Sequence, residues 1–207
     1  MVEATPAPAH PTVPLSVSVL HRVREATAVQ HKGLEARLPL TRPELDRATY
    51  TRVIEAYYGF HLPLQRHLQP FCSAENADAG RLKVAALLKD LKALGLTPPQ
   101  IGAIAQCTDL PLLENHAHLL GIQYVMEGAT LGGQVLRRII AERLSIDADS
   151  GGEFLDVYGQ DTGRLWKAFL KRLADADHPD HNRDVISAAC ATFACFERWL
   201  ECAGVLR

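Results

Sequence analysis

One histidine in the first part of the chain has the neighbours that a metal ligand needs. Around its predicted helix, at 100° per residue, His31 lies within about 40° of Leu20, Thr27 and Leu38, so we expect its ring to point inward. Glu35 follows one turn later on the same side and can hold one ring nitrogen. With that nitrogen engaged, the other is fixed in its tautomer and can bind a metal. The pair therefore indicates either a metal ligand or a hydrogen-bonded core histidine.

A group of glycines lies inside an apolar run that otherwise has the pattern of one long helix. Each glycine in a helix costs about 1 kcal/mol relative to alanine, so a compensating role is expected. Gly121, Gly128 and Gly132 share one helix face, and Gly133 allows a bend beside them. This strip of bare backbone suits a large flat ligand, with the histidine on the ligand's other side. A close helix crossing is the alternative.

The elements that would position these residues are all helical. Apolar residues recur at three- and four-residue steps over about 15–38, 82–94, 111–144, 162–175 and from 179 onward. A capping box at Thr41 predicts the start of another helix, interrupted at Gly59 and Pro63. No segment alternates with a period of two. We therefore predict an all-α, single-domain bundle of roughly seven to nine helices over residues 15–207, after a disordered proline-rich leader at residues 1–14.

Composition excludes several classes of protein. The formal net charge of -2 gives no field that would attract nucleic acid, so no nucleic-acid partner is expected. No stretch approaches the roughly 18 apolar residues of a membrane span, and no secretory signal is visible. Five scattered cysteines without CxxC spacing fit reduced thiols better than disulfides or a zinc site. We therefore expect a cytoplasmic protein without a membrane partner.

Two segments carry a family resemblance. Residues 23–31, with Glu35 beyond them, resemble the proximal helix of the heme oxygenases, whose histidine binds heme iron. Residues 124–135 resemble their glycine-rich distal helix, in the form found in bacterial enzymes associated with bacteriophytochromes. Residues 57–60 and 163–169 are also similar to that bacterial group, and the similarity spans about residues 15–200.

The resemblance implies a reaction and its participants. Heme b would be both cofactor and substrate, cleaved with O2 and external electrons to biliverdin, CO and ferrous iron. A ferredoxin or a flavoprotein would donate the electrons, and a bacteriophytochrome could receive the product. His31 would be the iron ligand oriented by Glu35, and Gly128, Gly132 and Gly133 would shape the catalytic distal wall. Further cofactor contacts are implied for Arg24, Thr27, Ala28, Tyr124 and Thr130.

The chain also departs from the family pattern. Many relatives have an aspartate directly after the first distal glycine, where it anchors a water network, and this position is Ala129. A tyrosine that joins the network in some relatives aligns with Phe60. A heme carrier or sensor without turnover therefore remains an alternative to the enzyme, whereas the ligand set of a di-iron protein is not found. For the heme propionates, Arg24 is the first candidate cation, ahead of three residues near Trp166: Arg164, Lys167 and Lys171.

Overall fold

The computed structural model describes residues 18–72 and 74–206, with side chains described outside 74–81; the leader predicted at residues 1–14 lies outside this range. Helices account for the architecture, and the described residues include no strand, which confirms the all-α prediction. The seven α-helices are α1 (Val19–Arg37), α2 (Arg47–Leu68), α3 (Ala74–Ala93), α4 (Pro98–Gly102), α5 (His116–Leu144), α6 (Thr162–Asp175) and α7 (Pro179–Cys202). Short turns η3 (Ala148–Gly152), η4 (Glu153–Asp156) and η5 (Gly159–Asp161) connect α5 to α6.

The start of α2 differs from the prediction. Asp46, not Thr41, caps the helix, and its carboxylate accepts a hydrogen bond from Thr49 N at 2.7 Å. Thr41 instead ends a 3-10 turn, η1 (Pro39–Thr41). The predicted capping box is therefore wrong, because the chain must first turn back from α1 before α2 can begin.

Helix α2 is also continuous where interruptions were predicted. Pro63 lies inside it and removes one helical hydrogen bond, but buried neighbours such as Phe60 and Leu64 pack on the core on either side. Gly59 allows a close contact between α2 and a neighbouring segment, since a Cβ there would lie 2.3 Å from the carbonyl oxygen of Ala105. Cys107 N donates to the Gly59 carbonyl at 2.9 Å, so this glycine admits the segment that precedes α5.

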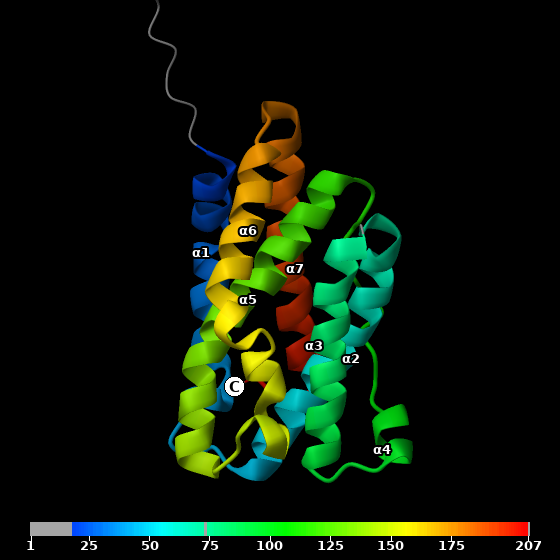
Figure 1. Ribbon diagram of the computed structural model, residues 1–207, viewed down its shortest axis with the longest axis vertical. Helices are drawn as coiled ribbons and strands as arrows, with labels where there is room; N and C mark the ends of the chain where they lie inside the picture. Colours follow the sequence, from blue (N-terminus) through cyan, green and yellow to red (C-terminus); the bar gives the residue numbers. More distant parts are fainter. Residues whose placement is uncertain (1–17, 73, 207) are drawn as a thin grey trace, which may run out of the picture.

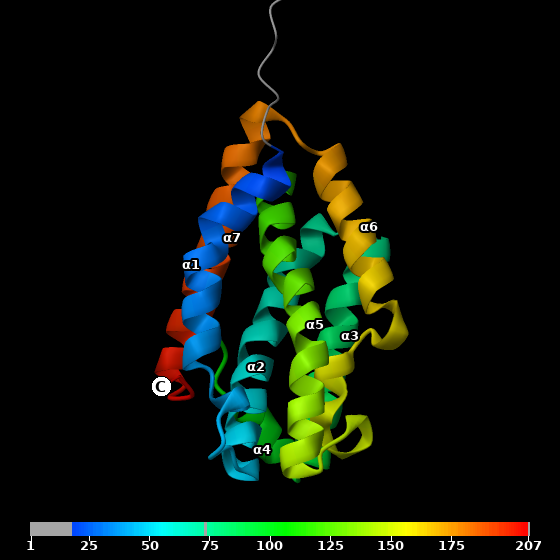
Figure 2. The ribbon, with the colours of Figure 1, turned by 90° about the vertical axis from the view of Figure 1, so that its left-hand side faces the viewer.

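Helix α7 lies between α1 and α5 and packs extensively against both. A Cβ at Gly121 of α5 would lie 2.3 Å from the Val185 carbonyl oxygen of α7, so the two main chains touch where these helices cross. Figure 2 shows α1 and α5 close together at their upper ends and diverging downward. In Figure 1 the first half of α5 runs obliquely and its second half upright, so the helix changes direction near its glycines.

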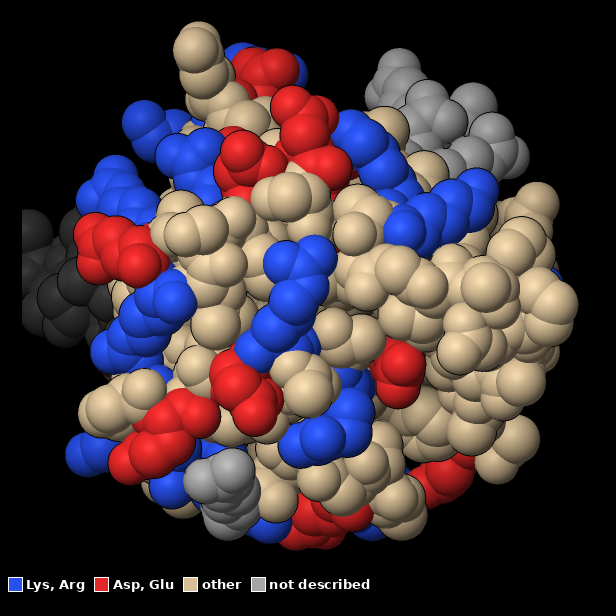
Figure 3. All heavy atoms as spheres, turned by 90° about the horizontal axis from the view of Figure 1, so that it is seen from below, with Lys and Arg blue, Asp and Glu red and all other residues tan. Residues whose placement is uncertain are grey.

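The surface carries charges of both signs. Seen from below in Figure 3, Lys and Arg alternate with Asp and Glu, and the side over α4 is mostly uncharged. Residues 93–108, which include α4, contain no charged side chain. Among the described residues, no helix combines the length and apolarity that a membrane crossing requires.

Candidate functional site

Helix α1 is fixed to α7 along its length, which places the residues of its exposed side. At its start, Val19 N donates to the carboxylate of Asp177, two residues before α7, at 2.9 Å. In the middle, the Gln30 side chain donates to the Cys190 carbonyl at 3.1 Å. At its end, Arg37 forms ion pairs with two acids of α7, Glu197 at 2.7 Å and Glu201 at 2.8 Å. These contacts hold α1 in one orientation about its own axis.

His31 occupies the edge of the α1 interface rather than its centre. Its side chain is 58% exposed, so the expectation that the ring points inward is wrong. The buried stripe runs through Val23, Thr27 and Leu34, and one helical step rotates His31 out of it. The ring remains in contact with α7, because its centroid lies 5.7 Å from that of Phe193.

The predicted partner of His31 is in place. Nε2 of His31 lies 3.2 Å from Oε1 of Glu35 across one turn. A carboxylate in this position accepts the N–H of the imidazole and leaves the second nitrogen with its lone pair. The structure therefore presents an exposed imidazole with one nitrogen engaged and the other, Nδ1, open to a ligand.

The other predicted residues of α1 fall on two sides of the helix. Arg24 and Ala28 are exposed and lie on the same side as His31, at seven and three residues before it. Thr27 is 2% exposed and its hydroxyl donates to the Val23 carbonyl at 2.7 Å. The polar group of Thr27 is thus used within the helix, and only Arg24 and Ala28 share the open side with the histidine.

Helix α5 presents a bare and apolar side. A Cβ at Gly132 would have no heavy atom within 4 Å, and one at Gly128 would meet only the Trp166 ring of α6, at 3.6 Å. Leu131 and Val135 are 41% and 60% exposed on the same side. Exposed apolar side chains beside open backbone form a surface that a flat apolar molecule can cover. We call Gly128, Leu131, Gly132 and Val135 the bare face of α5.

Gly133 and Gly121 serve contacts elsewhere. A Cβ at Gly133 would lie 2.6 Å from the carbonyl oxygen of Leu155 in η4. Gly121 admits the close crossing with α7 described above. The predicted strip of glycines on one face is therefore shorter than expected, since Gly121 fits the alternative of a helix crossing and Gly133 contacts η4. Of the predicted distal glycines, Gly132 leaves open backbone, and Gly128 lies at ordinary contact distance from the Trp166 ring.

Tyr124 and Thr130, both predicted cofactor contacts, are half-buried on α5. The Tyr124 ring lies 6.0 Å from that of Trp166, and the Thr130 hydroxyl donates to the Glu127 carbonyl at 2.7 Å. Ala129 is exposed, so the position of the missing aspartate faces solvent.

A buried polar cluster behind α5 was missed by the sequence analysis. Nζ of Lys83 in α3 lies 2.5 Å from Oε1 of Glu127, and the Tyr158 hydroxyl donates to Oε2 at 3.0 Å. The Lys83 side chain is only 5% exposed. Burial, and then the charge of Glu127, raises the pKa of Tyr158, which keeps its hydroxyl a donor. No local pattern marks this cluster, because Lys83 and Glu127 are 44 residues apart.

The candidate cations differ in their partners. Arg164 pairs with Asp161 at 2.9 Å, and Lys171 pairs with Asp175 at 2.7 Å. Arg24 and Lys167 are exposed and have no acidic partner among the described residues. The two uncommitted cations of this set are therefore Arg24 on α1 and Lys167 on α6.

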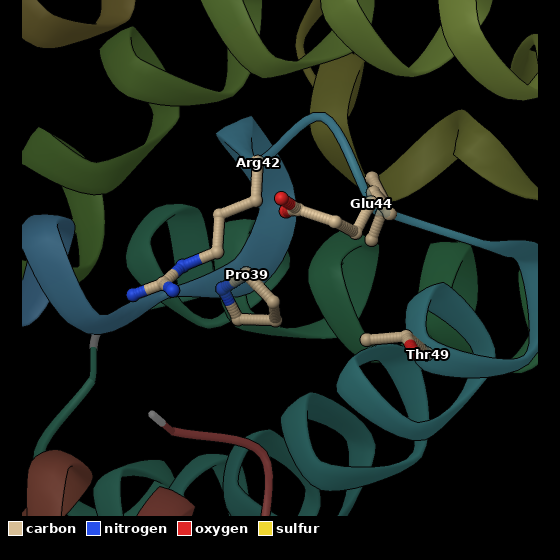
Figure 4. A pocket seen from close by; sticks show the side chains of 5 residues that line it. Pro39, Arg42, Glu44 and Thr49 are labelled. Atoms are coloured by element: carbon tan, nitrogen blue, oxygen red, sulfur yellow. The ribbon is translucent and has the colours of Figure 1, made fainter.

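Other features of the described residues lie apart from these two helix faces. No group of three or more His, Cys, Asp or Glu side chains there could hold a metal ion. A shallow pocket lies at the turn between α1 and α2, lined by Pro39, Arg42, Glu44, Leu45 and Thr49 (Figure 4). None of these residues belongs to the bare face of α5 or to the His31 side of α1.

Comparison with known proteins gives the family. The family model for heme oxygenase matches residues 17–202. The fold and this match define a heme-degrading oxygenase. The chain belongs to the heme oxygenase family. No curated protein matches it in sequence.

Solved structures share the fold at low sequence identity. The NO- and CO-bound heme oxygenase from Neisseria meningitidis has a TM-score of 0.71 at 22% identity, covering 92% of this chain and 94% of that one. Heme oxygenase from Leptospira interrogans has a TM-score of 0.69 at 19% identity, covering 88% and 98%. A domain of unknown function with a heme oxygenase-like fold, from Shewanella denitrificans, has a TM-score of 0.69 at 10% identity, covering 91% and 93%. Such low identities show the fold alone.

Proposed function

We propose that the chain binds heme b between the His31 side of α1 and the bare face of α5. The residues present fit the three chemical parts of heme. The exposed imidazole of His31 suits the iron, and the apolar Leu131 and Val135 beside open backbone suit the flat macrocycle. Uncommitted cations suit the two propionates. The observation that carries the proposal is the exposed His31–Glu35 pair on a helix that is fixed to α7.

In this proposal Glu35 positions the ligand. By accepting one N–H of the imidazole, its carboxylate fixes the tautomer and increases the basicity of the other nitrogen. Phe193 contacts the ring from α7 and limits its rotation. His31 is thus held from two directions, and its second nitrogen, Nδ1, would bind the iron.

On the opposite side, the absence of side chains at Gly128 and Gly132 lets backbone approach the ligand closely. Their neighbours Tyr124 and Thr130 would lie at the border of the same surface. Carbonyl groups of a helix that changes direction here are available to ordered water, which would take the place of the aspartate missing at Ala129. Gly133 would act indirectly, by allowing η4 to approach α5.

Arg24 and Lys167 would bind the propionates, because neither has another acidic partner in the described structure. The positive charge of these two side chains, at the edge of the heme where its propionates would lie, also suits an acidic electron donor such as a ferredoxin or flavoprotein. Both cations would therefore serve the entry of the ligand and the docking of the donor.

The proposed reaction is the O2- and electron-dependent cleavage of heme to biliverdin, CO and ferrous iron. Heme itself supplies the redox and oxygen chemistry when bound, and the chain supplies placement, hydrogen bonds and exclusion of water. A bacteriophytochrome is the proposed consumer of the bilin. The five cysteines are all free, which supports a reducing compartment such as the cytoplasm.

A heme carrier or sensor is the second candidate, favoured by Ala129. Supplying electrons under air to the purified heme complex separates the two functions. Appearance of biliverdin and release of iron support the enzyme, whereas a complex that stays intact supports the carrier. Heme titration of wild type and His31→Ala tests the site itself. We expect the variant to lose the histidine-type Soret band, and an unchanged spectrum would reject His31 as the ligand.

A further inference from the structure

The segment between α5 and α6 does more than connect two helices. We propose that residues 153–158, together with Lys83 and Asp90 of α3, form a brace that positions the bare face of α5, with Glu127 and Tyr158 as positioning residues. The inference deepens the proposed function, since the brace matters to catalysis only if heme binds on that face. Figure 1 shows this segment between the lower halves of α5 and α3.

The brace begins at a buried carboxylate. Asp90 of α3 is 0% exposed, and its two oxygens accept hydrogen bonds from Glu153 N and Phe154 N, both at 2.8 Å. These are the first two amides of η4, whose N–H groups have no partner within so short a helix. Lys89 of α3 adds an ion pair with Glu153 at 2.5 Å. The start of η4 is therefore tied to α3.

From there η4 is packed onto α5 at two adjoining positions. The Leu155 carbonyl approaches Gly133 so closely that any side chain would collide with it. The carboxylate of Asp156 accepts from the Gln134 amide at 2.5 Å and pairs with Arg137. Gly133 and Gln134 lie between Gly132 and Val135 of the bare face in sequence, and Arg137 follows it, so these contacts fix the second half of α5.

The buried cluster fixes α5 immediately before the bare face. Glu127 precedes Gly128, and both of its oxygens are engaged, one by Lys83 and one by the Tyr158 hydroxyl. The Lys83 ammonium also lies 5.3 Å from the centre of the Tyr158 ring. Burying such a pair costs desolvation free energy, so its benefit is a specified geometry rather than added stability.

Taken together, the contacts surround the bare face in sequence and lie on the other side of the helix. Glu127 is engaged before it, Gly133 and Gln134 within its length and Arg137 after it, whereas Gly132 has open space. Anchors at both ends determine the rotation of this stretch about the helix axis. Backbone at Gly128 and Gly132 is thereby held at one distance from a ligand bound on α1.

Tyr158→Phe tests the brace because it removes one hydroxyl and keeps the ring. The matched control is Tyr57→Phe, which removes another buried tyrosine hydroxyl, one without a hydrogen-bond partner among the described residues. Hydrogen exchange of the heme-free proteins is measured at the amides of 128–134. We expect exchange to become at least about tenfold faster in Tyr158→Phe alone, since a hydrogen bond to a carboxylate is lost. Equal rates in the two variants would overturn the brace.

A second readout links the brace to the ligand. In the ferrous heme complex, the C–O stretching frequency of added CO reports the surroundings on the α5 side. We expect this frequency to shift in Tyr158→Phe and to stay at the wild-type value in Tyr57→Phe. Faster exchange without a frequency shift would overturn positioning toward heme while leaving the contacts intact. Failure of wild type to bind heme would instead reject the proposed function.

A double variant, Lys83→Met/Glu127→Gln, tests the buried ion pair separately. It should still fold, because it removes both charges together and leaves no single charge buried. The amide carbonyl that replaces the carboxylate at position 127 can still accept from Tyr158. We expect its exchange rates to lie between those of wild type and Tyr158→Phe. Rates faster than in Tyr158→Phe would show that charge, not the Tyr158 hydrogen bond, holds the helix and would overturn the role given to Tyr158.

Discussion

Oε1 of Glu35 lies 3.2 Å from Nε2 of His31, and both side chains are more than half exposed. Removing this acceptor frees the ring and lowers its basicity as a ligand. We expect Glu35→Ala to weaken heme binding by about tenfold, the lower end of such effects, because solvent partly replaces an exposed partner. Heme titration followed at the Soret band measures the affinity for heme. Glu25→Ala, an exposed acid on the same helix, serves as the control and should bind like wild type.

Gly132 and Gly133 are adjacent but should respond to alanine in opposite ways. Gly132→Ala places its methyl group in open space and should raise the free energy of unfolding by about 1 kcal/mol while weakening heme binding. Gly133→Ala places a Cβ 2.6 Å from the Leu155 carbonyl and should lower the free energy of unfolding by about 1–3 kcal/mol. Denaturant unfolding of the heme-free proteins checks both, and effects of the same sign would contradict this interpretation.

Arg24→Ala and Lys167→Ala should each weaken heme binding, by about 5- to 10-fold, if they pair with propionates. Lys171→Ala is the matched control on α6, because Lys171 already pairs with Asp175. The measurement is heme titration at low and high salt, where the loss should shrink as salt screens the pairs. Equal effects of Lys167→Ala and Lys171→Ala would argue against a propionate contact at Lys167.

Asp90→Asn should destabilise the fold by about 2–3 kcal/mol, because two buried amide hydrogen bonds to a carboxylate become weaker and one oxygen is replaced by a donor. Burial raises the pKa of Asp90 to about 6, against the lowering effect of those two amides, so the carboxylate is charged at about pH 8. Urea unfolding at that pH tests the expectation. Asp161→Asn, at an exposed acid, should change the midpoint little.

His61 should make stability depend on pH. Burial, and then the charge of Lys83, lowers the pKa of His61 from 6.5 to about 3. Below the pKa of 6.5 the unfolded chain binds a proton that the folded chain does not bind until the pH approaches 3, so stability falls as pH drops through this window. The slope from this residue is at most about 1.4 kcal/mol per pH unit. His61→Gln should flatten the curve of unfolding free energy against pH, and parallel curves for variant and wild type would refute the assignment.

Local spacing was enough to select the candidate residues, but not to predict their environment. The four-residue step places Glu35 beside His31, and glycine in a helical run marks α5 as unusual. Spacing did not give the exposure of His31, because a residue about 40° from the centre of a stripe lies inside or outside depending on how α1 is rotated against α7. That rotation is set by Gln30, Arg37 and their partners in α7, all about 160 residues away.

The brace behind α5 could not be predicted from local sequence for the same reason. Nothing near Glu127 in sequence indicates Lys83 or Tyr158 as its partners, which lie 44 and 31 residues away. Ordinary local signals did indicate where most helices lie, including the end of α3 before Gly95, whose φ is +101°. The capping box at Thr41 failed because the same signal also suits a tight turn.

The contact between Gly121 and the Val185 carbonyl determines how the bundle can open. Main chain touches main chain there, so a ligand cannot separate α5 from α7 at that level. Movement between α7 and α5 must then be a rotation about this contact, with an amplitude that grows with distance from it. Gly132, which the brace holds in place relative to α3, lies about 16 Å further along the helix. A rotation through a small angle would thus displace the helices most beside a bound macrocycle and least at the contact between Gly121 and Val185.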